Sequence, residues 1–121
     1  MSAPVWIGVV LLGGAGAIAR FVLDSAVSAR LGRGFPLGTL VVNASGALAL
    51  GLLTGLAASG DTLVLAGTAT LGSYTTFSTW MLETHRLAED GALAPAALNV
   101  LVSLAIGIGA ELLGRAIGAH V

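Results

Sequence analysis

The stretch AGTATLGSYTTFSTWMLE, residues 66–83, carries eight hydroxyl side chains within twelve residues of an apolar segment. Polar residues inside a membrane span are functional candidates by default. Helical spacing would place Thr76, Thr79 and Glu83 on one stripe. An adjoining stripe would carry the two aromatic residues, Phe77 and Trp80. This pattern is typical of a conduit lining, although serine and threonine also bond back to their own helix in lipid.

The same stretch is a poor continuous helix, because Gly72 is followed by Ser, Tyr, Thr and Thr, which have mediocre helix propensity. A break here would free backbone groups at mid-membrane, where irregular backbone is tolerated only if it is buried in protein or lines a polar cavity. Freed carbonyl oxygens would suit a dehydrated alkali cation. The alternative, a simple kink satisfied by neighbouring side chains, stays open.

The composition of the whole chain predicts a membrane protein. The 121 residues are 56% hydrophobic and 9% charged, with a mean hydropathy of +0.99, whereas soluble domains carry about 25% charge. There is no cysteine, so disulfides and thiolate metal sites are excluded. Lysine is also absent and the net charge is −1, so no basic surface exists for nucleic acid.

Hydropathy predicts an all-α protein with one domain, residues 1–121. The weak helix propensity after Gly72 predicts that the third helix is broken at mid-membrane. The four expected spans are about 4–27, 36–58, 62–87 and 93–117. The tight turn at 59–62 offers Asp61 or Thr62 as an N-cap. The first span contains Arg20 and Asp24 and lacks a basic start, so we interpret it as a retained helix rather than a signal peptide.

The short loops carry a weak arginine bias, an excess of about two on one side. The positive-inside rule would place the termini outside, but near balance also permits insertion in both orientations. Four short helices enclose little volume, so a solute pathway needs a second chain. We therefore expect a homodimer.

Other polar residues inside the spans are further candidates. Thr39 and Asn43 are four residues apart and would face one vestibule, unless Asn43 only joins helices. Arg20 can pair with Asp24 one turn later, extend to the headgroups, or attract an anion at a vestibule mouth.

The fourth span carries Asn99 and Ser103, also four residues apart. Ser103 would point inward if the face with Gly107 and Gly114 contacts another helix. The chain contains no Gly-x-Ser-x-Gly elbow, no Walker lysine and no His-Glu-x-x-His motif, so we expect no enzyme.

Three stretches, GAIARF at 16–21, GTLVVNASGALALGLL at 38–53 and GSYTTFSTWMLE at 72–83, together resemble the small fluoride channel family known as Fluc or CrcB. GAIARF at 16–21 is similar to its Gly-Ala-x-x-Arg-aromatic segment, and GTLVVNASGALALGLL at 38–53 is similar to its Gly-Thr-Leu-x-x-Asn-x-x-Gly signature. GSYTTFSTWMLE at 72–83 resembles the family core and is the most specific of the three.

The resemblance implies an antiparallel, dual-topology homodimer with one sodium ion at its centre. Backbone carbonyls at the matching positions, Gly72 and Thr75, would bind this structural Na⁺. The chain departs from the family pattern at three positions, Ser73, Tyr74 and Trp80, the last in place of a phenylalanine.

Two pores per dimer are also implied, in which Phe77 of one chain and Trp80 of the other turn their positive ring edges toward fluoride. The remaining pore residues implied by the resemblance are Asn43, Thr39, Ser78, Thr79, Ser103, Glu83 and Arg20. The expected function is a fluoride-selective passive channel that exports cytoplasmic fluoride. The expected location is the cell membrane as a multi-pass protein, specifically the bacterial inner membrane, with the lipid bilayer and a second copy as partners.

Two alternatives come from other classes. A small multidrug-type, proton-coupled cation exporter shares the length and span number, but it depends on a carboxylate inside the first helix. Here that helix has only Asp24, near its end and beside Arg20. A non-conducting membrane subunit would leave the hydroxyl cluster without a purpose.

Overall fold

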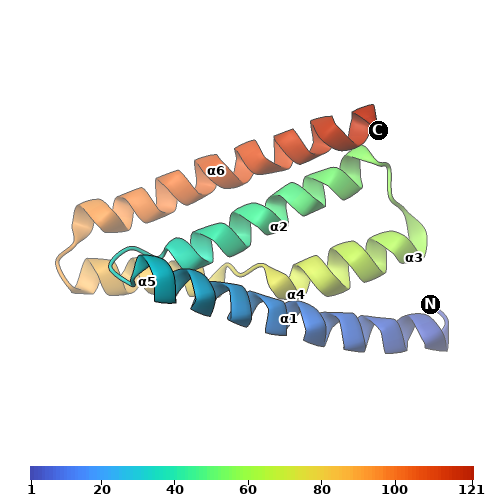
Figure 1. The fold of residues 1–121 in the computed structure, drawn as a ribbon, viewed down its shortest axis with the longest axis horizontal. Coiled ribbons are helices and arrows are strands. Elements are labelled where there is room, and N and C mark those ends of the chain that lie inside the picture. Colours follow the sequence, from blue (N-terminus) through green and yellow to red (C-terminus); the bar gives the residue numbers. More distant parts are fainter.

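The computed structural model describes residues 1–121, all helical and without a strand. Three helices are long and apolar enough to cross a membrane: α1 (Ala3–Leu31), α2 (Leu37–Gly55) and α6 (Leu93–His120). Successive long segments run in opposite directions, so both termini lie at the same end of the molecule (Figure 1). The expected all-α architecture is confirmed at this level.

The third apolar segment consists of several short pieces. It begins with α3 (Gly60–Thr62) and a π-helix, η1 (Leu63–Leu71), and continues with α4 (Gly72–Tyr74). The chain then leaves helical geometry over residues 75–77 and resumes as α5 (Ser78–Glu89). The predicted break in the third helix is therefore confirmed, and Figure 1 shows it as a thin coil beside α4.

The π-helical turn of η1 has no counterpart in the sequence prediction. The hydroxyl of Thr70 donates to the carbonyl of Leu65, five residues earlier, at 2.7 Å. Gly16 of α1 lies against the Thr70 carbonyl so closely that a Cβ at this position would overlap it. The π-turn is thus supported by a side chain and covered by a glycine of α1, and such turns occur frequently at functional sites.

The turn before α3 differs from expectation. Ser59, in extended geometry, precedes the helix, and its side chain makes no capping hydrogen bond. Gly60 has φ 56°, which glycine adopts without steric cost. The N-cap is therefore Ser59, two or three residues before the predicted positions. Asp61 lies within the first turn, and the N-cap assignment to Asp61 or Thr62 was wrong.

Glycines allow α2 and α6 to cross at close range. A Cβ at Gly51 would overlap the carbonyl of Glu111, and one at Gly114 would overlap that of Leu48. Two further glycines, one turn on, make equivalent contacts: Gly55 and Gly118. Small residues four apart are typical of helix pairs in lipid. Gly107, in contrast, has no atom within 4 Å of a Cβ position, so the predicted contact face includes Gly114 but not Gly107.

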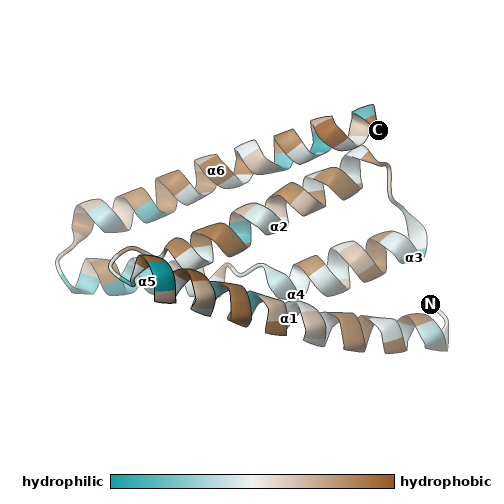
Figure 2. Ribbon diagram, viewed as in Figure 1, coloured by the Kyte–Doolittle hydropathy of each residue, from teal (hydrophilic) through white to brown (hydrophobic).

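Most apolar side chains point outward. Only 14 of 121 residues are buried. Figure 2 shows apolar residues along much of α1 and α6, and many of their large apolar side chains are exposed. The largest fully buried side chains are Val42 and Asn99. An outward apolar surface of this extent requires lipid or another chain around it.

Candidate functional site

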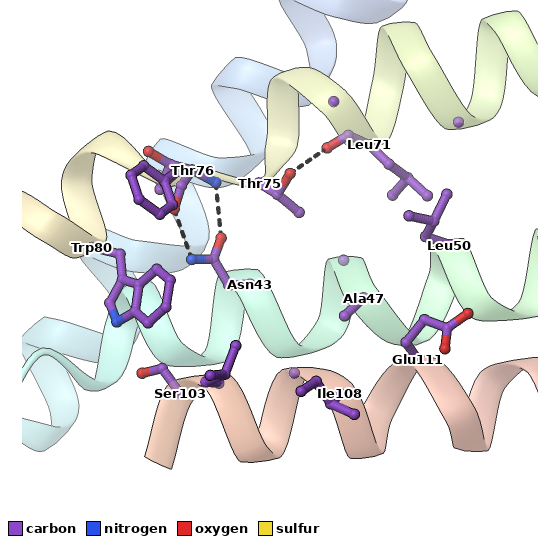
Figure 3. A pocket seen from close by; sticks show the side chains of 16 residues that line it. Asn43, Ala47, Leu50, Leu71, Thr75, Thr76, Trp80, Ser103, Ile108 and Glu111 are labelled. Carbon is purple, nitrogen blue, oxygen red and sulfur yellow. Dashed lines mark hydrogen bonds between the residues drawn. The ribbon is translucent and has the colours of Figure 1, made fainter. Parts of the chain in front are cut away.

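Asn43 of α2 holds the break in the third segment. Its Oδ1 accepts a hydrogen bond from the Thr76 N–H at 2.8 Å, and its Nδ2 donates to the Thr76 carbonyl, also at 2.8 Å. Figure 3 shows both bonds between the side chain and the extended backbone above it. The interrupted backbone at Thr76 is thus satisfied inside the protein, as membrane depth requires.

This arrangement diverts two backbone N–H groups from their helical partners. In a continuous helix Thr76 N–H would bond the Gly72 carbonyl, but it bonds Asn43 instead. Likewise Thr79 N–H bonds the Thr76 hydroxyl at 3.2 Å rather than the Thr75 carbonyl. The carbonyls of Gly72 and Thr75 therefore lack the donor that a helix supplies.

A large groove of ≈520 Å³ lies between the broken segment, α2 and α6. Six residues of the predicted site line it: Asn43, Gly72, Thr75, Phe77, Trp80 and Ser103. Figure 3 shows Trp80 and Ser103 at one end and Glu111 at the other. Glu111 is the only charged residue in the lining. No arginine enters this groove, so around Asn43, Phe77 and Trp80 an anion would meet dipoles and ring edges, with the Glu111 carboxylate at the opposite end.

Phe77 and Trp80 form an edge-to-face pair, with ring centroids 5.6 Å apart and planes at 88°. Phe77 is 70% exposed, an unusual state for a phenylalanine between helices. The indole N–H of Trp80 donates to the carbonyl of Asn99 in α6 at 3.0 Å. The pairing of Phe77 with Trp80 follows from their spacing, whereas the Asn99 contact had no signal in the sequence.

The second hollow, of ≈190 Å³, lies on the α1 side of the broken segment and is called the Arg20 hollow. Arg20, Thr39 and Thr79 line it, and Thr76 lines both this hollow and the large groove. Thr39 and Asn43 therefore face different hollows rather than the single vestibule that their spacing suggested.

The ion pair between Arg20 and Asp24, which was one of the predicted alternatives for Arg20, is not formed. Arg20 and Asp24 form no ion pair, since the only pair within 4 Å joins His85 and Glu89. Asp24 instead accepts a hydrogen bond from Ser28 at 3.3 Å. Arg20 thus forms no ion pair within the chain, although the Asp24 carboxylate lines the same hollow.

The two remaining predicted residues line neither hollow, but each contacts a residue that does. The Glu83 carboxylate accepts a hydrogen bond from the Thr39 hydroxyl, which joins α5 to α2. Ser78 is exposed, and its hydroxyl lies 3.4 Å from that of Thr76. Tyr74, a departure from the family pattern, has its hydroxyl 2.7 Å from that of Ser45.

Comparison with known proteins identifies the family. Residues 7–115 match the family described as "CrcB-like protein, Camphor Resistance (CrcB)". This chain belongs to the CrcB family. The resemblance stated above is thus confirmed, and with its apolar helices this CrcB chain is a multi-pass protein of the cell membrane.

Individual CrcB relatives cover nearly the same length. A protein of Mycolicibacterium paratuberculosis named "Fluoride-specific ion channel FluC 2" is 56% identical over 94% of this chain and 93% of its own. One of Mycobacterium tuberculosis with the same name is 52% identical over 95% of this chain and 91% of its own. One of Haloarcula marismortui is 48% identical over 80% and 82%.

Proposed function

We propose that this chain forms a fluoride-selective passive channel that exports cytoplasmic fluoride. The observation that carries the proposal is the large groove, in which an amide, hydroxyls and an aromatic pair gather without a single cationic side chain. High identity over nearly full length to proteins named fluoride-specific ion channels supports it.

The chemistry of the groove suits a small, strongly hydrated anion. Fluoride gives up water only where donors replace it, and hydroxyl and amide groups are such donors. The edges of Phe77 and Trp80 carry the positive part of the ring quadrupole. Conduction requires several weak sites, and a lysine or arginine in the bore would hold the anion too tightly.

The functional unit is an antiparallel dimer with two pores, and each chain contributes four spans, the third being the broken one. Phe77 is mostly exposed at the mouth of the groove in one chain, and a second chain in the opposite orientation covers it. Phe77 of one chain then faces Trp80 of the other across each pore. The weak arginine bias of the loops supports dual insertion.

A structural sodium ion at the dimer centre fits the donors that the break exposes. The carbonyls of Gly72 and Thr75 have lost their helical N–H partners and lie on the groove. The chain contains no group of three or more His, Cys, Asp or Glu side chains that lie close together. It therefore offers no set of ligands for a transition metal. Uncharged carbonyl oxygens suit a monovalent alkali ion, which would supply a fixed positive field.

The Arg20 hollow serves as the vestibule. The guanidinium of Arg20 raises the local concentration of anions before they enter the narrow path. Thr39 and Thr79 line this hollow, and Glu83 accepts a hydrogen bond from Thr39. Thr76 lines both the hollow and the large groove and so connects them. From there Ser78 and Ser103 continue the polar track.

The bacterial inner membrane is the proposed location.

Fluoride efflux from liposomes that contain the purified protein, measured with a fluoride electrode, tests this function. We expect rapid fluoride efflux and no chloride leak in the matched chloride assay. Absence of fluoride efflux from folded, assembled protein would overturn the proposal. Dissipation of a drug-cation gradient would then be measured as the competing activity.

A further inference from the structure

Asn99 makes the densest set of polar contacts between α5 and α6. It is only 1% exposed, although it is a polar residue in a mostly apolar helix. Its Nδ2 donates to the Thr84 hydroxyl at 2.8 Å and lies 3.4 Å from the Trp80 carbonyl. Its own backbone carbonyl accepts the indole N–H of Trp80. One residue of α6 thus contacts both the ring and the backbone of Trp80.

The position of the indole N–H has a chemical consequence. A free indole N–H is a hydrogen-bond donor, and beside an anion path it would add a strong point of attachment. Here this donor is already bonded to a backbone carbonyl 3.0 Å away, on the α6 side. The ring therefore presents its carbon edges, and these carry only partial positive charge.

We propose that Asn99 is a positioning residue for the anion path, which holds Trp80 in one orientation and keeps its indole N–H away from fluoride. The contacts of Asn99 with Trp80 and Thr84 are called the Asn99 clamp. The clamp also reaches Ser103, whose hydroxyl donates to Asn99 Oδ1 at 3.4 Å. This inference rests on the proposed function for its effect on flux, but the clamp itself can be measured without transport.

A single-tryptophan protein tests the clamp directly. The chain has two tryptophans, and Trp6, which is 56% exposed and lines neither hollow, is replaced by phenylalanine. In this background Asn99→Leu removes, at similar volume, the side-chain contacts with Thr84 and the Trp80 carbonyl that hold α5 in place, while the backbone carbonyl that accepts the indole N–H stays. We expect lower fluorescence anisotropy and stronger acrylamide quenching of Trp80, and fluoride efflux reduced about fivefold, the scale of one lost hydrogen bond.

A matched pair of threonines provides the control. Thr84 and Thr54 both bond back to the carbonyl four residues earlier, at 2.9 Å, but only Thr84 accepts from Asn99. Thr84→Val should loosen Trp80 in the same direction as Asn99→Leu, whereas Thr54→Val should leave anisotropy and efflux unchanged. If Asn99→Leu does not assemble, Thr84→Val carries the test.

A double-mutant cycle separates positioning from general stability. Trp80→Phe removes the indole N–H and keeps a ring edge, and its own efflux is the reference for the double variant. Adding Asn99→Leu to it should reduce efflux much less than in the Trp80 protein. An equal reduction in both backgrounds, or unchanged anisotropy in assembled Asn99→Leu, would overturn the proposal. Lower anisotropy with normal efflux would also overturn it. If the starting protein shows no fluoride efflux, the proposed function is overturned. The fluorescence anisotropy of Trp80 still decides whether the clamp exists.

Discussion

Asn43 replaces, with one side chain, both hydrogen bonds that a helix would give Thr76. The amide has an acceptor and a donor at the correct separation, and both bonds measure 2.8 Å. A carboxylate at position 43 could only accept, and a hydroxyl would have to donate and accept through a single atom. The residue that holds the break is therefore defined by its chemistry, and the same amide lines the large groove beside Trp80.

At the residue scale, Phe77 gives the sharpest prediction for transport. Phe77→Ile keeps an apolar side chain but removes the ring edge that would contact fluoride. We expect at least a tenfold loss of fluoride efflux, measured in liposomes, with dimers still formed on size-exclusion chromatography. Phe35→Ile, in the loop between α1 and α2, is the control and should conduct normally. Normal efflux from assembled Phe77→Ile would remove this residue from the pore.

Local residue patterns predicted some of the site and not the rest. The break followed from Gly72 and the four residues after it, because weak helix propensity is local. The partner of Thr76 could not be predicted, since Asn43 lies 33 residues away and only the packing of α2 brings it there. The same holds for Trp80 and Asn99, which are 19 residues apart.

At the element scale, the crossing of α2 and α6 depends on glycines at the contact. The sequence indicated small residues on the fourth span, but it could not distinguish Gly114, which contacts α2, from Gly107, which lines the groove. The π-turn of η1 was not predicted either, because it depends on Thr70 and on the glycine face of α1. Helix existence was predictable, whereas helix contacts were not.

Gly51→Ala tests this crossing. The added Cβ would overlap the carbonyl of Glu111, and overpacking of this kind costs about 1–3 kcal/mol. We expect a lower melting temperature in detergent by thermal unfolding. The matched control is Gly109→Ala, because no atom lies within 4 Å of its Cβ position, and it should melt at or slightly above the starting value. Equal melting temperatures for the two variants would contradict the close crossing.

The break in the third segment makes a second prediction at this scale. If the carbonyls of Gly72 and Thr75 bind sodium, replacing all sodium by N-methyl-D-glucamine should reduce fluoride efflux at least tenfold. Restoring sodium should restore the flux, and the fluoride gradient is held constant throughout. Equal activity after exhaustive sodium removal would count against this site.

At the scale of the whole molecule, the outward face is the dominant feature. Three long helices turn apolar side chains away from the fold, and the large groove opens beside an exposed Phe77. Membrane residence follows from that surface and from the family. The second copy and its antiparallel orientation stay predictions.

Labelling a single cysteine measures orientation. The natural chain has no cysteine, and Gly34, in the loop between α1 and α2, has open space at its Cβ position and a φ outside the left-handed region. Gly34→Cys in sealed vesicles should react with a membrane-impermeant maleimide to about one half, and completely after permeabilisation. Labelling that is complete or absent before permeabilisation would show a single orientation.

The bond between Asn43 and Thr76 also constrains the order in which the chain enters the membrane. During synthesis the N-terminal segments emerge first, so α2 is already present when the interrupted segment arrives. The N–H and carbonyl of Thr76 can then bond to the Asn43 side chain immediately, so they are not left unpaired in hydrocarbon. A circular permutant that delivers α2 last would insert its third segment without this partner. Such a chain should be retained by quality control and degraded, even though every residue of the mature fold is present.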